Sequence, residues 1–186
     1  MPRTERAAPR FGREDWIELG LARLAREGPE ALTIERMTDA AKKTRGSFYH
    51  HFADHAAFLR ALGVRWLEED TQGVIALAET ARLSGKRRET LARRAALIDA
   101  RLERNMRRLA VGEPVIAGIV AESDAQRIAY LTRLFRSELG LDAADAAARA
   151  RLQHCAYVGA QIVFPDADEK FRLKQEATTK RTLWRK

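Results

Sequence analysis

One short segment combines side chains that could recognise DNA: TRGSFYHHF, at residues 44–52. Arg45 can pair with guanine O6 and N7 in the major groove, and Ser47 is a short donor and acceptor. Gly46 has no side chain, so a backbone at this position can approach bases closely. The segment therefore has the chemistry of a surface that contacts base edges.

Helical geometry separates the polar from the apolar side chains of this segment. At ~100° per residue, Phe48 and Phe52 lie about 40° apart and should face a core. Gly46 and His50 then lie on the opposite face, with Tyr49 beside them. Because Tyr49 and His50 can donate hydrogen bonds to phosphates, this face could grip the DNA backbone as well as its bases.

The flanking sequence supplies the elements that would position such a helix. Residues 13–27 predict one helix. Thr33 and Thr44 are N-cap candidates for two short helices separated by a tight turn, and Asp54 caps the next helix. This order predicts a helix-turn-helix unit, which places the second helix of the pair in the major groove.

The rest of the chain also predicts helices, so we expect an all-α protein of about nine helices. Strand-forming runs are sparse and alanine is abundant. Apolar spacing predicts one long helix through residues 91–109 and a short helix over 114–121. A capping box at Ser123 opens another helix, and Asp142 caps an alanine-rich helix that runs to about residue 164. Pro165 begins a polar final segment.

Residues 13–62 resemble the TetR family of bacterial transcription regulators, most closely over residues 44–52. The resemblance implies a DNA-binding domain at residues 1–60 and a helical ligand-sensing and dimerisation domain at 61–186. It also implies a homodimeric repressor that binds a palindromic operator in double-stranded DNA. An apolar small-molecule effector would relieve that repression. The residues that it assigns to DNA contact are Thr33, Thr44, Arg45, Gly46, Ser47, Tyr49, His50 and His55, to which we add Lys42 and Lys43.

Three positions depart from the pattern of that family, two in the turn and one at the start of the next helix. The turn commonly holds glycine and then an apolar residue, whereas this chain has Lys42 and Lys43. Lys42 must then adopt a left-handed conformation or reshape the turn. His55 stands where a lysine is often found. Because a mostly neutral histidine is a weaker phosphate partner, we expect the two turn lysines to supply the positive charge.

Candidate effector contacts are large or polar side chains near the apolar stripes of the later helices. A ligand pocket in a helical domain is mostly apolar with a few convergent polar groups. We expect at least two of these residues to line one cavity, although each could equally be an ordinary core residue. The seven candidates are Trp66, Asn105, Met106, Tyr130, His154, Tyr157 and Gln161.

Composition and charge limit the other possibilities. The formal net charge of +8 favours a polyanionic partner. The longest near-apolar run, at residues 114–121, is too short to span a bilayer, so we expect no membrane segment. The single cysteine, Cys155, gives no sign of an oxidising compartment, which favours the cytoplasm. We expect no cofactor, no metal site and no enzymatic activity, because no catalytic set of side chains is apparent.

Two alternatives stay open at this stage. The same fold could serve an architectural or cell-division DNA-binding protein that has a protein partner and no small-molecule ligand. Arginines also recur every seven residues at positions 87, 94, 101 and 108. They are either a solvated helix face or a surface for an acidic partner or anionic ligand.

Overall fold

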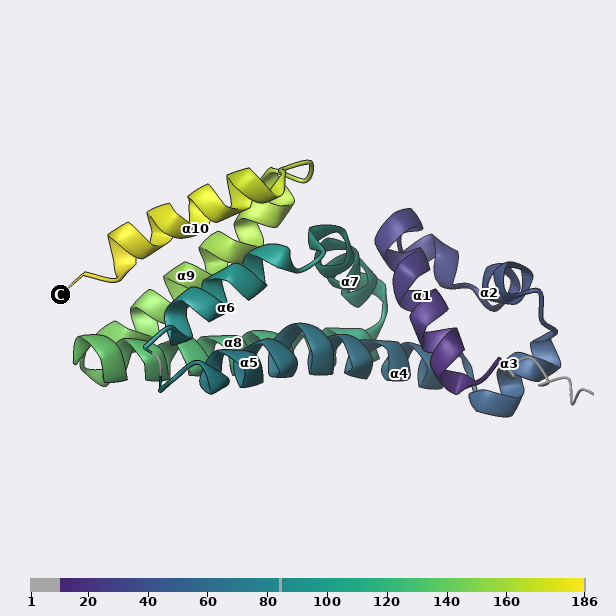
Figure 1. Ribbon diagram of the computed structural model, residues 1–186. Coiled ribbons are helices and arrows are strands. Elements are labelled where there is room, and N and C mark those ends of the chain that lie inside the picture. Colours follow the sequence, from purple (N-terminus) through teal and green to yellow (C-terminus); the bar gives the residue numbers. More distant parts are fainter. Residues whose placement is uncertain (1–10, 84, 186) are drawn as a thin grey trace, which may run out of the picture.

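The computed structural model describes residues 11–83 and 85–185, and their regular secondary structure is entirely helical. The predicted all-α class is confirmed. Figure 1 shows a small unit of α1, α2 and α3 at one end, and α4 running from it into a larger helical half. The elements are α1 (Arg13–Glu27), a 3₁₀ turn η1 (Pro29–Leu32), α2 (Ile34–Ala41), α3 (Arg45–His51), α4 (His55–Leu67), a π-helical segment η2 (Glu68–Gly73), α5 (Val74–Thr80), α6 (Arg87–Leu97), α7 (Ala100–Gly112), α8 (Pro114–Leu139), α9 (Ala143–Val163) and α10 (Glu169–Leu183).

The predicted N-caps begin the helices of the small unit. The Thr33 hydroxyl accepts from the amide of Arg36, and the Thr44 hydroxyl accepts from the amide of Ser47. The Asp54 carboxylate caps α4 in the same way. Each cap satisfies an amide that the first helical turn leaves unpaired. The predicted helix boundaries around α2, α3 and α4 are therefore confirmed.

Lys42 adopts the left-handed conformation that its position requires, with φ 52° and ψ 45°. Its amide donates to the carbonyl of Asp39, and the amide of Lys43 donates to that of Thr38. This pair of bonds is a Schellman motif, which ends α2 and turns the chain into α3. Among the non-glycine residues that the structure describes, Lys42 alone has a positive φ.

One hydrophobic core connects the small unit to the larger half. Phe48 packs edge-on against Trp16 and Phe58, with both pairs of ring centroids 5.3 Å apart. The same buried cluster continues to Met106 on α7 and Ile116 on α8. The predicted boundary between a DNA-binding domain and a second domain, after residue 60, thus falls inside a continuous core. The division into two domains stays a prediction.

The larger half differs from the sequence prediction at two points. The single helix expected over residues 91–109 breaks between α6 and α7, because the Asp99 carboxylate caps α7 through the amide of Arg101. The break expected before Ser123 is absent, and α8 is continuous. The Ser123 hydroxyl instead pairs with that of Thr71, 2.7 Å away in the interior. The first prediction was wrong because it followed the apolar spacing and overlooked the N-cap at Asp99, and the second because Ser123 pairs with a distant residue instead of capping a helix.

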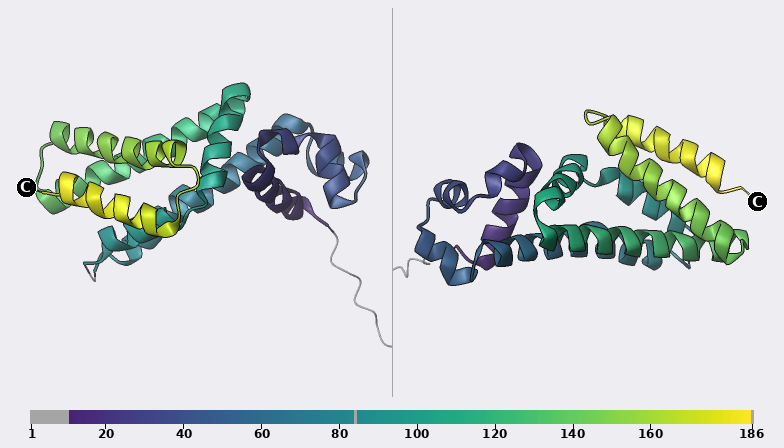
Figure 2. Two further views of the ribbon diagram at one scale, coloured as in Figure 1. Left: turned by 90° about the horizontal axis from the view of Figure 1, so that it is seen from above. Right: turned by 180° about the vertical axis from the view of Figure 1, so that it is seen from behind.

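The polar final segment forms α10, which lies alongside α9 in both views of Figure 2. Trp184 anchors its end, since the indole stacks on Phe135 with ring centroids 4.1 Å apart. Trp184 also donates to the side-chain oxygen of Gln153. In the part of the chain that the structure describes, no helix is long and apolar enough to cross a membrane.

The conformation of Lys42 predicts a stabilising substitution. Glycine adopts left-handed dihedrals without the steric cost of a Cβ, which is about 1 kcal/mol. Lys42→Gly should therefore raise the Tm by about 2–4 °C, measured by circular dichroism. Lys43→Gly is the matched control, because Lys43 has a negative φ and should gain nothing. An unchanged or lower Tm in Lys42→Gly would contradict the assignment.

Candidate DNA-binding interface and effector cavity

The outer face of α3 has the composition that the sequence predicted. Phe48 is fully buried, whereas the Tyr49 ring is half exposed. Arg45, Gly46 and His50 are exposed on the outer side of the helix. An added Cβ at Gly46 would meet only the Thr44 hydroxyl, at 3.6 Å, so the backbone lies open here. The core side of α3 is thus fixed by aromatic packing while its polar side faces solvent.

Arg45 forms an ion pair with Glu35 on α2. Both side chains are more than half exposed, 65% for Arg45 and 60% for Glu35. Exposed ion pairs contribute little stability, so Arg45 can exchange this carboxylate for a base at small cost. Sequence analysis missed Glu35, because the angle at which α2 and α3 meet cannot be read from residue spacing.

The remaining residues predicted to contact DNA surround this face. Thr33, Lys42, Lys43 and Thr44 are exposed, and Ser47 is half-buried. These residues occupy the start of α2, the turn and the first residues of α3. The predicted base-reading and phosphate-gripping positions on these elements are therefore accessible to solvent, completely or in part.

His55 is the exception, because its ring has a partner inside the protein. The Nε2 atom lies 2.8 Å from the carbonyl oxygen of Leu32 and donates to it when protonated. The ring is half-buried and ties the start of α4 to η1. The contact of His55 with phosphate stays a prediction, and it would have to be made by Nδ1, because Nε2 faces the Leu32 carbonyl.

A buried ionic network lies at the centre of the larger half. The Glu103 side chain is only 1% exposed and pairs with Arg107 at 2.7 Å and Arg127 at 3.1 Å. Arg107 also pairs with Asp124, which accepts from His154. Burial alone would raise the pKa of Asp124, but the hydrogen bonds from Arg107 and His154 hold it well below its usual range.

Arg127 joins this network to the π-helical segment. Its Nε donates to the Thr71 hydroxyl at 2.9 Å, and one Nη donates to the backbone carbonyl of Asp70. The guanidinium also lies over the rings of Trp66 and Tyr157, 5.5 Å and 5.7 Å from their centroids. Most of its hydrogen-bond donors are therefore occupied within the protein.

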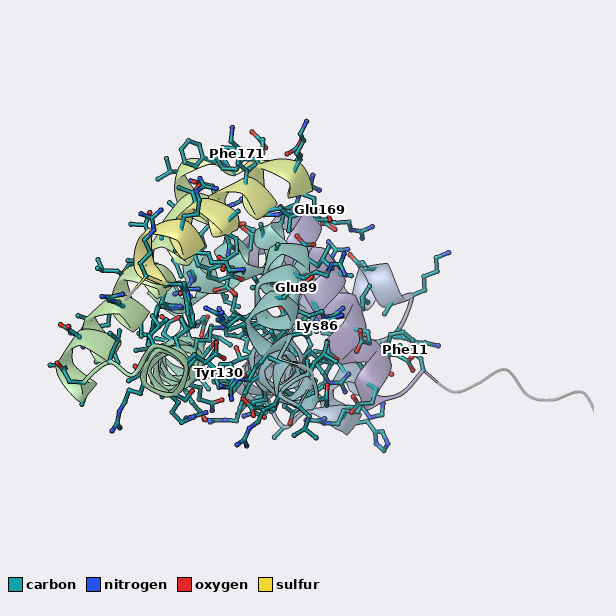
Figure 3. All side chains as sticks on the ribbon, turned by 60° about the vertical axis from the view of Figure 1, so that its left-hand side comes forward. Phe11, Lys86, Glu89, Tyr130, Glu169 and Phe171 are labelled. Carbon is teal, nitrogen blue, oxygen red and sulfur yellow. The ribbon has the colours of Figure 1, made fainter. Side chains whose placement is uncertain are left out.

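Two adjacent cavities lie beside the network, with volumes of about 70 Å³ and 130 Å³. The smaller is enclosed by η2, α5, α6, α8, α9 and α10, and the larger by α6, α9 and α10 with the flanking loops. Tyr130 lies on the side of α8 that faces α5 (Figure 3). The two cavities share Ala92, Ala95, Ile98, Tyr157 and Glu176 in their linings.

Four of the seven predicted effector residues line these cavities. Tyr130, His154 and Tyr157 line the smaller one, and Tyr157 and Gln161 line the larger one. The structure places the other three outside both linings: Trp66 and Met106 in the hydrophobic core and Asn105 against α1.

Several polar atoms at the cavities lack a hydrogen-bond partner. They are Oδ2 of Asp70, the hydroxyl of Tyr157 and Oε1 of Gln161, and each of these atoms is buried. Burial and the nearby charge of Glu103 raise the pKa of Asp70 from 3.8 to about 6. Burial likewise raises the pKa of Glu176, which borders both cavities.

Residues 17–62 match the family of bacterial regulatory proteins called the tetR family. The chain carries a TetR-family DNA-binding domain. This match covers the helix-turn-helix, including the whole of α3. The predicted family resemblance is thus confirmed over the part of the chain that carried it.

The overall fold also has a counterpart among solved structures. A crystal structure described as a candidate TetR-family transcriptional regulator from Rhodococcus sp. is similar with a TM-score of 0.70 and 13% sequence identity. The similarity covers 92% of this chain and 97% of that one, so the fold extends well beyond the TetR-family domain. No curated protein matches the sequence.

Because Arg45 is exposed on α3, we predict that it contacts a base of the DNA directly. If Arg45 contacts guanine, Arg45→Ala should weaken specific binding by about 1–3 kcal/mol per half-site, mainly at one base pair. Fluorescence anisotropy with a set of single-base DNA variants measures this effect. Glu35→Gln, which leaves Arg45 intact, should not weaken binding. An equal loss across all DNA sequences would instead assign Arg45 to the phosphate backbone.

Asp70 predicts an unusual dependence of stability on pH. Because its folded pKa of about 6 exceeds the ordinary 3.8, folding loses stability as the pH rises through this window. Asp70→Asn should therefore stabilise the protein by on the order of 2–3 kcal/mol at pH 8 and have almost no effect at pH 4. Urea unfolding at both pH values measures the difference. Glu68→Gln, at an exposed carboxylate of the same segment, is the control, and a destabilised Asp70→Asn at pH 8 would refute the argument.

Proposed function

We propose that this TetR-family DNA-binding regulator acts as a homodimeric repressor of a palindromic operator, relieved by a small molecule. The observation that carries the proposal is α3, a helix fixed by buried aromatic rings with a polar face open to solvent. Arg45, Gly46 and Ser47 would contact bases. Phosphate contacts are proposed for the other predicted residues, namely Thr33, Lys42, Lys43, Thr44, Tyr49, His50 and His55. The proposal assigns the protein to the cytoplasm and gives it no catalytic activity.

The outer faces of α8 and α9 support the proposed dimer. On α8, exposed small residues recur every four positions at Ala117, Ala121, Ala125 and Ala129. On α9, exposed apolar residues extend from Leu152, which is 59% exposed, to Val163, which is 66% exposed. The remaining members of this α9 face are Cys155, Ala156 and Ile162.

Small residues allow helices to approach closely, so two copies could form a four-helix bundle from α8 and α9. Because α10 packs onto α6 and α9 within the same chain, we propose α8 and α9, rather than α10, for this role.

The proposed relief of repression needs a connection between the cavities and α3. The wall formed by α6 is lightly anchored, because Ala96 is its only buried residue. From α6 the chain leads into α7, where the Asn105 amide donates to the carbonyl of Leu24 on α1 at 2.8 Å. Arg108 on α7 also pairs with Glu30. A ligand that displaced α6 would therefore shift α7 against α1, and DNA and ligand would weaken each other's binding equally.

Selection from a random-sequence DNA library tests this proposal. The purified protein should enrich a two-fold symmetric sequence, because a dimer presents two related α3 helices. The half-site centres should lie about 34–36 Å apart, or a multiple of that distance. Enrichment of no sequence would favour the architectural alternative, and enrichment of a single unpaired half-site would contradict the dimer.

The proposed interface predicts that a bulky charge on α8 prevents dimerisation. Ala125→Arg would place a long cation from each copy where two helices approach closely, so the variant should sediment as a monomer and lose operator affinity. Sedimentation velocity measures the mass, and circular dichroism confirms the fold. The control is Ala177→Arg, at an exposed alanine of α10, which should leave the dimer intact. A dimeric Ala125→Arg protein would exclude this face of α8 from the interface.

A further inference from the structure

We propose that the paired cavities bind a small amphipathic amine, with its ammonium group against the Asp70 carboxylate and its apolar part between α5, α6 and α8. This assignment deepens the proposed function, because the amine would be the effector. It rests on unpaired polar atoms and on the balance of charges around the cavities.

Asp70 is the strongest indication of a cationic ligand. Its Oδ2 atom is buried, borders the smaller cavity and has no hydrogen-bond partner. A buried carboxylate without a partner destabilises a protein, and the raised pKa of this group reflects that cost. An ammonium group supplies both the missing charge and the missing donor.

The two arginines of the buried network, Arg127 and Arg107, are already paired with other carboxylates. Arg127 pairs with Glu103 and donates to the Thr71 hydroxyl and the Asp70 backbone. Arg107 is shared between Glu103 and Asp124. The two arginines are thus paired with Glu103 and Asp124. Asp70 is attracted by the nearby charge of Arg127 but has no ion pair of its own among the described residues.

Glu176 adds a second carboxylate to the same space. It borders both cavities, and its hydrogen bond from Gln153 is long, at 3.4 Å. The cation that acts on it electrostatically is Lys180, which is exposed on α10 and outside both linings. The larger cavity is also lined by Arg172, whose guanidinium donates to the backbone carbonyls of Ala96 and Ala167. Asp70 and Glu176 outnumber this one cation, which favours a positive ligand over an anionic one.

The remaining lining suits an amphipathic molecule. The smaller cavity has apolar walls that include Val74, Leu91 and Leu131. Tyr157 presents an unpartnered hydroxyl, and Gln161, only 6% exposed, presents an unpartnered oxygen to the larger cavity. The Gln161 oxygen can only accept a hydrogen bond, so an ammonium group can pair with it, whereas a carboxylate or purely hydrocarbon ligand would leave it unpaired.

The volumes set the size of a suitable probe. An apolar cavity of about 150 Å³ accommodates one benzene molecule. Neither cavity here, at about 70 Å³ and 130 Å³, reaches that volume alone, so a single ring with a short substituent would have to extend across both. Benzylamine, benzyl alcohol and benzoate share this shape and differ in charge, which makes them a matched set of probes.

The test is isothermal titration calorimetry of the full chain with the three probes at pH 7.5. We expect benzylamine to bind at least about tenfold more tightly than benzyl alcohol, since hydrogen bonds to charged groups are the stronger ones. Benzoate should bind most weakly. Asp70→Asn should lose about tenfold in benzylamine affinity and abolish the preference for the amine. Glu68→Gln, which removes an exposed carboxylate outside both cavities, should keep that preference.

Other results would overturn the assignment. Equal or weaker binding of benzylamine relative to benzyl alcohol, or no binding of any probe, excludes a cation site. An unchanged benzylamine affinity in Asp70→Asn excludes Asp70 from it. Glu176→Gln, expected to lose a smaller part of the affinity, provides a second variant, and urea unfolding verifies the fold of each one. If benzylamine binds as expected without changing affinity for the selected operator, the cavity assignment holds and the proposed relief of repression fails.

Discussion

The buried carboxylate of Glu103 is the constraint on which the arrangement of the larger half depends. A carboxylate that is 1% exposed requires compensation, and Arg107 and Arg127 both supply it. Removing Glu103 would leave two buried guanidinium groups with too few partners. Because Arg107 also holds Asp124 and Arg127 also holds η2, this one carboxylate fixes α7 against α8 and the π-helical segment.

The position of α7 then connects the cavities to the DNA-binding unit. On one side, α7 carries Glu103 and follows directly from α6, which borders both cavities. On the other side, Asn105 and Met106 contact α1 and the core that supports α3. The carboxylates and guanidinium groups of this network are all paired. Asp70 lies beside them at the cavity, and its Oδ2 atom has no hydrogen-bond partner. We infer that this unpaired group is kept for ligand binding at the expense of stability.

The sequence predicted those features that depend on neighbouring residues. The N-caps at Thr33 and Thr44 and the buried face of α3 follow from local hydrogen bonding and helical periodicity, and the structure has them as expected. The continuity of α8 through Ser123 depends on a distant partner, Thr71, so the local capping pattern gave the wrong result there. The break at Asp99 is a local cap that the apolar spacing of residues 91–109 concealed. The candidate effector residues divide for the same reason. Residue type alone could not distinguish Tyr130 and Tyr157 at a cavity from Trp66 and Met106 in a core. The ion pair between Arg45 and Glu35 could not be predicted either, because it depends on how α2 and α3 meet.

The central claim is that α3 enters the major groove of DNA, and cleavage from a chelated metal on that helix tests it most directly. His51→Cys in a Cys155→Ser background gives one attachment point for an iron chelate at the end of α3, since His51 is not completely buried and is not among the residues proposed to contact DNA. On the operator selected by the protein, the account predicts strand cleavage centred in the major groove at two symmetric places, one in each half-site. Cleavage centred in the minor groove, or cleavage spread evenly along the DNA, would contradict it.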